Sequence, residues 1–224
     1  MIIEATGLTK EFARARGGKR LFMAVHPLDI GLEGSQLTAV AGHSGSGKST
    51  LLNMLAGILT PTAGSVRIDG TDLYSLRDEE RSRLRNERIG LVPQGHTALR
   101  ALTVLDNVLL PSILYSRDEA PAERACELLS AVGLSDLADA APTELSGGEL
   151  RRMAIARALL MDPAIVLADE PTAGLDHANA TAVLTLLREA ADRGAAVLVV
   201  SHEAEARSFA DRCYAMEDGH LSED

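Results

Sequence analysis

The 224-residue chain contains no tryptophan, only 3 phenylalanines and 3 tyrosines, and only 2 cysteines. Because Cys126 and Cys213 lack the spacing of a metal site, we expect both to be reduced and structural. Hydrophobic residues make up 46%, yet no apolar run approaches the roughly 18 residues that a transmembrane helix needs. The segment Met1–Glu4 also lacks the basic and apolar regions of a signal peptide. We therefore predict a single domain over residues 1–224, with no linker or repeat dividing it.

The chain has fewer basic than acidic residues: 22 Lys and Arg against 32 Asp and Glu, which gives a formal net charge of −10. This balance argues against a general polyanion-binding surface, so no nucleic-acid partner is expected. The densest basic segment alternates in sign, which favours a solvated helix face. Its charged residues are Arg81, Arg83, Arg85 and Arg88, with Glu79, Glu80 and Glu87.

A glycine-rich loop at residues 42–49 fits the pattern GxxxxGK(S/T) of a phosphate-binding P-loop. It follows the strand-like run 37–41 and opens the helix-like run 49–56, so that the helix N-terminus faces the anion. Lys48 places a cation on the β- and γ-phosphates, and the Ser49 hydroxyl can ligate Mg²⁺. A plain surface turn would not bring strand, loop, lysine, hydroxyl and helix in this order. The expected phosphate-binding residues are Gly42, His43, Ser44, Gly45, Ser46, Gly47, Lys48, Ser49 and Thr50.

An apolar run at residues 165–168 ends on two carboxylates, Asp169 and Glu170. Such a run is typical of a buried parallel strand, and ligands of open α/β sheets bind at the carboxyl ends of strands. We expect Asp169 to hold Mg²⁺, directly or through water, and Glu170 to polarise the water that attacks the γ-phosphate. A simple strand cap is the alternative, which the upstream P-loop disfavours.

A second glycine-containing cradle lies at residues 145–149. Ser146 stands where a helix N-cap would, Gly147 and Gly148 permit close backbone approach, and a helix is expected over 149–160. This helix N-terminus could also present N–H groups to an anion. Since one nucleotide needs only one P-loop, the chain is predicted to work in pairs.

Together these motifs make the chain resemble the ATP-binding subunits of ABC transporters over nearly its whole length. The resemblance implies an α/β P-loop NTPase fold with a RecA-like core, a small antiparallel β-subdomain and an α-helical subdomain at about residues 96–160. It also implies that two ATP molecules with Mg²⁺ are sandwiched between two copies of the chain. The γ-phosphate held by one P-loop would then be bound by the opposite copy's Ser146, Gly147, Gly148 and Glu149.

Three further positions match motifs of this family. Gln94 corresponds to the Q-loop glutamine, which contacts Mg²⁺ or the attacking water and senses the membrane partner. Asp176 corresponds to the D-loop, and His202, after the apolar run 195–201, to the switch histidine at the γ-phosphate. The catalytic residues implied are Lys48, Gln94, Glu170 and His202, and the implied Mg²⁺ ligands are Ser49, Gln94 and Asp169.

Some positions depart from the commonest family pattern. Glu149 replaces a glutamine, Pro93 an aromatic residue and Ser201 a threonine, and none of these changes removes a directly catalytic group. The family usually stacks adenine on an aromatic residue before the P-loop. Phe12 occupies that position and Phe22 is the fallback, while a core role for Phe12 is an equally open alternative.

Periodicity and turn residues give a coarse secondary structure. Strands are expected up to about residue 40 and at 66–70 and 195–201, helices at 102–108, 122–132 and 176–193, and a tight turn at 217–220.

The resemblance further implies a separate integral membrane permease subunit that holds the chain at the cytoplasmic face of the cell membrane. Its contact is expected between Gln94 and Ser146. Candidate contact residues are Leu99, Arg100, Leu102 and Leu105, with an internal apolar helix face as the alternative for the leucines.

The runs 84–90, 102–108 and 166–172 are similar to one branch of the family, which includes lipoprotein-release, macrolide and peptide export, haem-export and cell-division ATPases. We therefore predict ATP-driven dimer closure that powers efflux or extrusion through the membrane subunit. One alternative is a cell-division-type ATPase that regulates an extracytoplasmic enzyme without transport. Another is a soluble ABC ATPase acting on nucleic acid or ribosomes, which the acidic charge and the lack of a long heptad or zinc-binding insertion oppose. No Asn-Lys-x-Asp sequence supports a GTPase.

Overall fold

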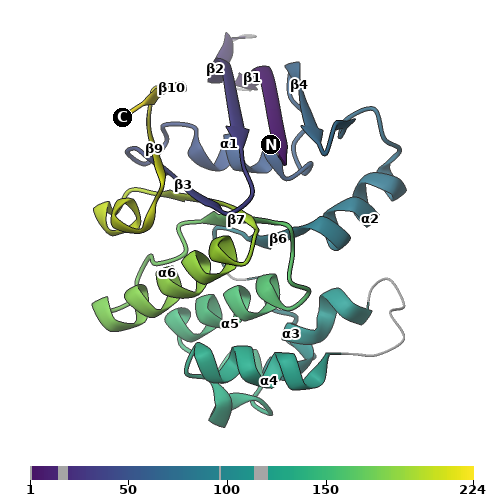
Figure 1. The fold of residues 1–224 in the computed structure, drawn as a ribbon, viewed down its shortest axis with the longest axis vertical. Helices are drawn as coiled ribbons and strands as arrows, with labels where there is room; N and C mark the ends of the chain where they lie inside the picture. The colour runs from purple at the N-terminus through teal and green to yellow at the C-terminus, as the bar shows by residue number, and fades with distance from the viewer. Residues whose placement is uncertain (1, 15–19, 96, 114–120) are drawn as a thin grey trace.

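The computed structural model describes residues 2–14, 20–95, 97–113 and 121–224, which form two sheets and a helical layer (Figure 1). The upper, antiparallel sheet has the order β2-β1-β4-β5. Its strands are β1 (Ile3–Arg14), β2 (Arg20–Leu32), β4 (Ala63–Ile68) and β5 (Thr71–Asp72).

The second sheet has the order β10-β9-β3-β8-β7-β6 and is parallel except for the antiparallel edge strand β10. Its strands are β3 (Gln36–Ala41), β6 (Ile89–Val92), β7 (Ile165–Asp169), β8 (Ala196–Ser201), β9 (Arg212–Glu217) and β10 (His220–Glu223). The helices are α1 (Lys48–Leu55), α2 (Asp78–Arg88), α3 (Val104–Ile113), α4 (Ala122–Ala131), α5 (Gly147–Leu159) and α6 (His177–Asp192), with 3₁₀ turns η1 (Ser135–Leu137), η2 (Pro142–Glu144) and η3 (Ala204–Phe209).

Strand β7 divides the hydrophobic core into two halves. Ile165 and Leu167 pack into the cluster shared with α1 and the antiparallel sheet. Val166 and Ala168 pack into the cluster formed with α3 to α6, which lie below the sheet in Figure 1. Successive strand residues point to opposite faces, and both faces are covered, which explains why this run is apolar without polar alternation.

These elements confirm the predicted α/β fold with an antiparallel subdomain and a helical layer. The helix predicted at 102–108 instead spans Val104–Ile113, so both predicted ends were wrong. Thr103 Oγ1 accepts the Asp106 N–H at 3.0 Å, and Asp106 Oδ2 accepts the Thr103 N–H at 3.3 Å, so the helix begins only at Val104. It also continues through Pro111 to Ile113.

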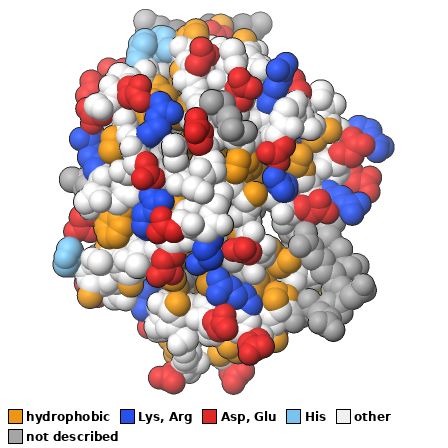
Figure 2. Space-filling view, in the orientation of Figure 1, with side chains coloured by type: hydrophobic (Ala, Val, Ile, Leu, Met, Phe, Trp, Pro, Cys, Tyr) orange, Lys and Arg blue, Asp and Glu red, His pale blue; other side chains and the backbone are white. Residues whose placement is uncertain are grey.

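Helix α2 is the solvated charged helix that the sign alternation predicted, since none of its residues is buried. Arg83 Nε lies 2.9 Å from Glu87 Oε1, and Arg81 pairs with Asp78. Figure 2 shows acidic and basic side chains interspersed at the position of α2 and over the rest of the visible face.

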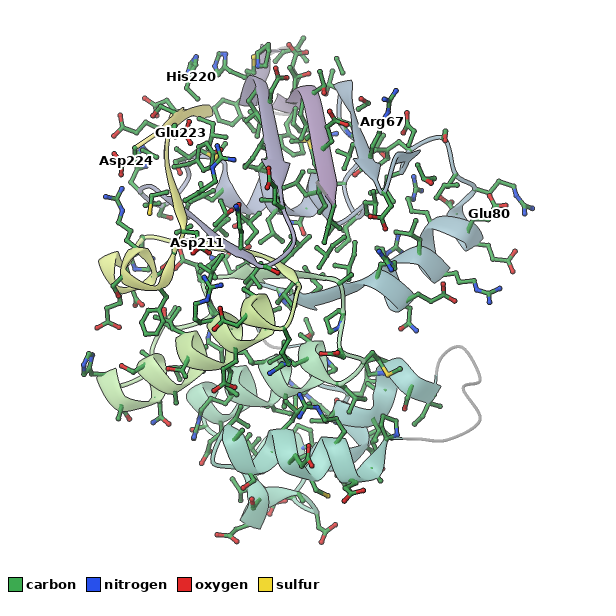
Figure 3. The ribbon with its side chains drawn as sticks, in the orientation of Figure 1. Arg67, Glu80, Asp211, His220, Glu223 and Asp224 are labelled. Carbon is green, nitrogen blue, oxygen red and sulfur yellow. The ribbon has the colours of Figure 1, made fainter. Side chains whose placement is uncertain are left out.

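Asp211, labelled in Figure 3, fastens α6 to the parallel sheet. Its Oδ2 accepts the Leu37 N–H of β3 at 2.7 Å and Arg188 Nη1 of α6 at 2.6 Å. The Arg188 guanidinium keeps the pKa of this carboxyl below its usual range, with the Leu37 N–H adding to the effect. This contact fixes the helix that follows Asp176 against the strand that precedes the P-loop.

Cys126 is exposed, Cys213 is half-buried, and both are free thiols. Among the helices that the structure describes, none is both long enough and apolar enough to cross a bilayer.

Candidate functional site: a phosphate cavity at the parallel sheet

The predicted site residues follow four neighbouring parallel strands. The P-loop follows β3, His202 follows β8, Glu170 follows β7 and Gln94 follows β6. They open onto a cavity of about 690 Å³. Its lining consists of Phe12, Phe22, Ala24, His43, Ser44, Gly45, Gly47, Lys48, Ser49, Thr50, Gln94, Arg151, Glu170, Ala173 and His202.

The P-loop needs its glycines for both conformation and space. Gly47 has φ 108°, and a Cβ at this residue would lie 2.5 Å from the Ala24 carbonyl oxygen. A Cβ on Gly42 would lie 2.2 Å from the carbonyl oxygen of Met216. Only glycine adopts the first conformation without strain, and only glycine fits the second position.

Lys48 lies beneath the loop. Its Nζ donates to the carbonyl oxygens of Gly42 at 2.7 Å and His43 at 3.0 Å, so the ammonium is already aimed at the centre of the cradle. Gly42 and Ser46 support the loop from outside the cavity lining, and Ser46 is buried.

Asp169, which ends β7 directly before the cavity-lining Glu170, is 2% exposed. Burial raises the pKa of its carboxyl, and the hydrogen bond with the Ser49 hydroxyl partly opposes that rise. Its Oδ1 has no hydrogen-bond partner among the described residues. Hard divalent cations prefer oxygen ligands, so this unpaired carboxylate oxygen beside a P-loop hydroxyl fits Mg²⁺.

Glu170 has φ 50°, a left-handed conformation that costs a non-glycine residue about 1–3 kcal/mol and concentrates at functional sites. Its Oε2 accepts from Ser201 Oγ at 3.1 Å and lies 2.9 Å from His202 Nδ1. Lys48 Nζ lies 4.0 Å from its Oε1. The hydrogen bond with Glu170, reinforced by its negative charge, raises the pKa of His202.

The glycine cradle at 146–149 lies outside this cavity, and so does Asp176. Ser146 caps α5 as predicted, because its Oγ accepts the Glu149 N–H at 3.3 Å and Glu149 Oε2 accepts the Ser146 N–H at 2.7 Å. Asp176 caps α6 through the Asn179 N–H at 2.9 Å. Ser146, Gly147 and Asp176 are exposed, so both caps are open to a partner.

Phe12 and Phe22 face each other directly across the β1–β2 pair. Their exposed fractions are 39% and 41%, and both line the cavity, which excludes the core role considered for Phe12.

Two polar residues were not predicted to contact Glu170. Arg151 lines the cavity, and its Nη1 donates to the Glu170 carbonyl oxygen. Ser201 appeared in the sequence only as a substitution for threonine, yet its hydroxyl still holds the Glu170 carboxylate. No spacing rule points to Arg151, because its contact joins helix α5 to a residue 19 positions later in the sequence.

A family model described as ABC transporter matches residues 25–173. The lipoprotein-releasing system ATP-binding protein LolD of Hydrogenovibrio crunogenus is 42% identical over 223 residues, covering 99% of this chain and 96% of that protein. The macrolide export ATP-binding/permease protein MacB of Rhodopseudomonas palustris is 41% identical over 218 residues. That match covers 97% of this chain and 33% of MacB, so the chain spans about a third of this relative.

Two solved structures of one protein are similar over nearly the whole chain. The dimeric bacterial ABC transporter cassette MJ0796 is 33% identical with a TM-score of 0.91. Its dimeric post-hydrolysis state bound to ADP and Pi is 32% identical with a TM-score of 0.90. Each match covers 99% of this chain and 98% of the solved chain.

Proposed function

The chain belongs to the ABC transporter family, and we propose from this premise that it is the ATP-hydrolysing subunit of a membrane efflux or extrusion complex. The observation that carries the proposal is the meeting of Lys48, Asp169, Glu170 and His202 at one edge of the parallel sheet. Ser146 caps a helix outside the cavity that Lys48, Glu170 and His202 line. Residues 1–224 act as one ATP-binding domain, with the helical subdomain at about 96–160.

The described side chains divide the chemistry among them. Lys48 binds the β- and γ-phosphates, and Ser49, Asp169 and Gln94 hold Mg²⁺, which when bound neutralises phosphate charge. Glu170 accepts the proton of the attacking water, and His202 supports the γ-phosphate from the neighbouring strand end. Phe12 and Phe22 pack on the adenine ring.

Ser146 and its glycines act in trans. Their helix N-terminus is exposed and lies outside the chain's own cavity, so a phosphate held by a second copy can approach it. The dimeric form of the similar MJ0796 cassette supports this pairing. Closure depends on the γ-phosphate that bridges the two copies, and hydrolysis removes that bridge.

A membrane subunit positions the chain at the cytoplasmic face of the cell membrane. Its docking surface includes two adjoining cavities of about 250 and 350 Å³, which share Asn86, Ile89 and Leu91. Leu99, which follows Leu91 closely in the sequence, is exposed and available for contact. Leu105 packs partly against the domain's own core, so we no longer propose it as a contact residue. The names of the two curated relatives favour release or export as the work performed.

Phosphate release by the purified chain in Mg-ATP tests the proposed activity. We expect turnover in the parent chain and none above background in Lys48→Ala, because the lysine places positive charge on the transferred phosphate. Absence of ATP-dependent phosphate release from the folded parent chain, alone and in its membrane complex, would contradict the proposal.

A further inference from the structure

Helix α5 touches both the chain's own cavity and the surface assigned to the partner's nucleotide. Ser146, its N-cap, is exposed and lies outside the cavity. Arg151, five residues later on the same helix, lines the cavity beside Glu170. One rigid element therefore reaches the two sites at once.

Arg151 holds the backbone of Glu170 and not its carboxylate. Nη1 of the arginine donates to the Glu170 carbonyl oxygen. The backbone N–H of Ala173 also donates to that oxygen, at 3.3 Å. The peptide nitrogen of Glu170 is bound on its other side, since it donates to the Val200 carbonyl oxygen at 2.8 Å.

This carbonyl belongs to the residue in the left-handed conformation. With φ at 50°, Glu170 departs from the direction of β7 and turns its carboxylate toward Ser201 and His202. A strained conformation persists only where surrounding contacts over-determine it. Arg151 supplies one of those contacts.

Stability alone does not account for Arg151. Within the described ranges, no carboxylate lies within ion-pair distance of its guanidinium, and its buried Nε has no hydrogen-bond partner. Asp169 interacts electrostatically with the guanidinium without forming a direct ion pair, and burying a cation that lacks a direct partner costs folding free energy. Among the described residues, the direct hydrogen bond of Arg151 is with Glu170, the residue assigned as the general base.

We propose that Arg151 is a positioning residue that links the helix carrying the trans-acting Ser146 to the backbone of Glu170. When the nucleotide held by the partner docks on the N-terminus of α5, this link fixes the position of the Glu170 carboxylate in the chain's own site. The inference rests on the proposed function, because it takes Ser146 to act in trans and Glu170 to be the base. Packed helices shift as rigid bodies, so a displacement at the N-cap of α5 is carried to Arg151. Hydrolysis at one ATP site of the dimer is therefore coupled to nucleotide docking at the other.

The test compares Arg151→Met, which keeps the length of the side chain but removes its donors, with Arg151→Lys, which keeps a charged donor. Arg124→Met on α4 is the matched control, because Arg124, within the part of the chain that the structure describes, forms its ion pair with Glu127 of its own helix at 3.1 Å. ATP affinity of the single chain, Tm, kcat, KM and the Hill coefficient for ATP are measured for each variant.

For Arg151→Met we expect ATP affinity and KM within about twofold of the parent, and a fall in kcat of roughly 10–100-fold, as for a misplaced catalytic group. The Hill coefficient should fall from above 1 toward 1. Arg151→Lys should recover part of both kcat and the Hill coefficient, and Arg124→Met should match the parent.

Parent-like kcat and Hill coefficient in Arg151→Met would overturn the inference while leaving the proposed ATPase intact. If Tm, ATP affinity and kcat all fell in Arg151→Met, and none recovered in Arg151→Lys, the inference would also be overturned. That result would show that Arg151 only stabilises the fold. A folded parent without ATP hydrolysis would instead overturn the proposed function.

Discussion

Oε2 of Glu170 lies 2.9 Å from Nδ1 of His202, so the assigned general base and the switch histidine share a hydrogen bond. The backbone N–H of His202 also approaches the same oxygen at 3.3 Å. The two strand ends that carry them, β7 and β8, are therefore joined at the point where the γ-phosphate is expected.

Glu170→Gln should lower the pKa of His202. The hydrogen bond and negative charge of Glu170 raise this pKa above the ordinary value of about 6.5. The stability contributed by the pair is thus complete below about pH 6.5 and is lost as pH rises through the raised pKa. The His202 ring protons, followed by NMR across pH, report the shift.

Ser201→Ala is the control for this titration, because it removes a hydroxyl that donates to Glu170 but no charge. His202 should keep its raised pKa in that variant. An unchanged His202 titration in Glu170→Gln would show that Glu170 is not the source of the shift.

Phe12→Ala and Phe22→Ala should each weaken ATP binding. Both rings line the cavity from opposite positions on β1 and β2, and stacking of a base on an aromatic ring is worth about 1–3 kcal/mol. Equilibrium binding of ATP and of inorganic triphosphate separates the base from the phosphates. Only ATP binding should weaken, and a loss confined to one variant would assign the base to that ring alone.

Much of this site follows from the sequence because strand ends and loops are local. The P-loop, Asp169, Glu170 and His202 each follow an apolar run, and parallel strands bring their carboxyl ends to one edge. The contact of Arg151 with Glu170 has no such local signal, since it joins a helix to a strand end 19 residues later. Similarly, the register of β1 on β2 shifts at three places, so spacing alone did not show that Phe12 faces Phe22.

Asn107→Leu should destabilise the turn that precedes α3. This fully buried amide accepts the Leu99 N–H at 2.7 Å and donates to the carbonyl oxygens of Leu99 at 3.0 Å and Thr103 at 2.8 Å. An unsatisfied buried polar group costs about 1–3 kcal/mol. Urea unfolding should show a loss of this size, whereas Asn86→Leu, which breaks a single bond to the Pro111 carbonyl oxygen at 3.0 Å, should lose less. Equal losses would contradict the role assigned to Asn107.

Replacing Leu99, Arg100 and Leu102 with Asp should uncouple the ATPase from the membrane subunit. These residues lie on the turn that Asn107 holds, and Leu99 is exposed. Basal ATP hydrolysis should stay within about twofold of the parent, because none of the three lines the cavity, and stimulation by the membrane subunit should fall. Leu21→Asp, at an exposed leucine on β2, is the control for adding charge. Unchanged binding and stimulation by the partner would exclude this contact.

ATP-dependent dimerisation of Glu170→Gln tests the central claim most directly. Glutamine keeps the shape of the side chain without accepting a proton, so turnover should fall by roughly 10²–10⁴-fold while ATP binding is retained. Analytical ultracentrifugation in saturating Mg-ATP should show a species of twice the 23.7 kDa chain mass, and Ser146→Arg in the same background should abolish it. A Glu170→Gln chain that binds ATP yet sediments at 23.7 kDa at high concentration would contradict the account.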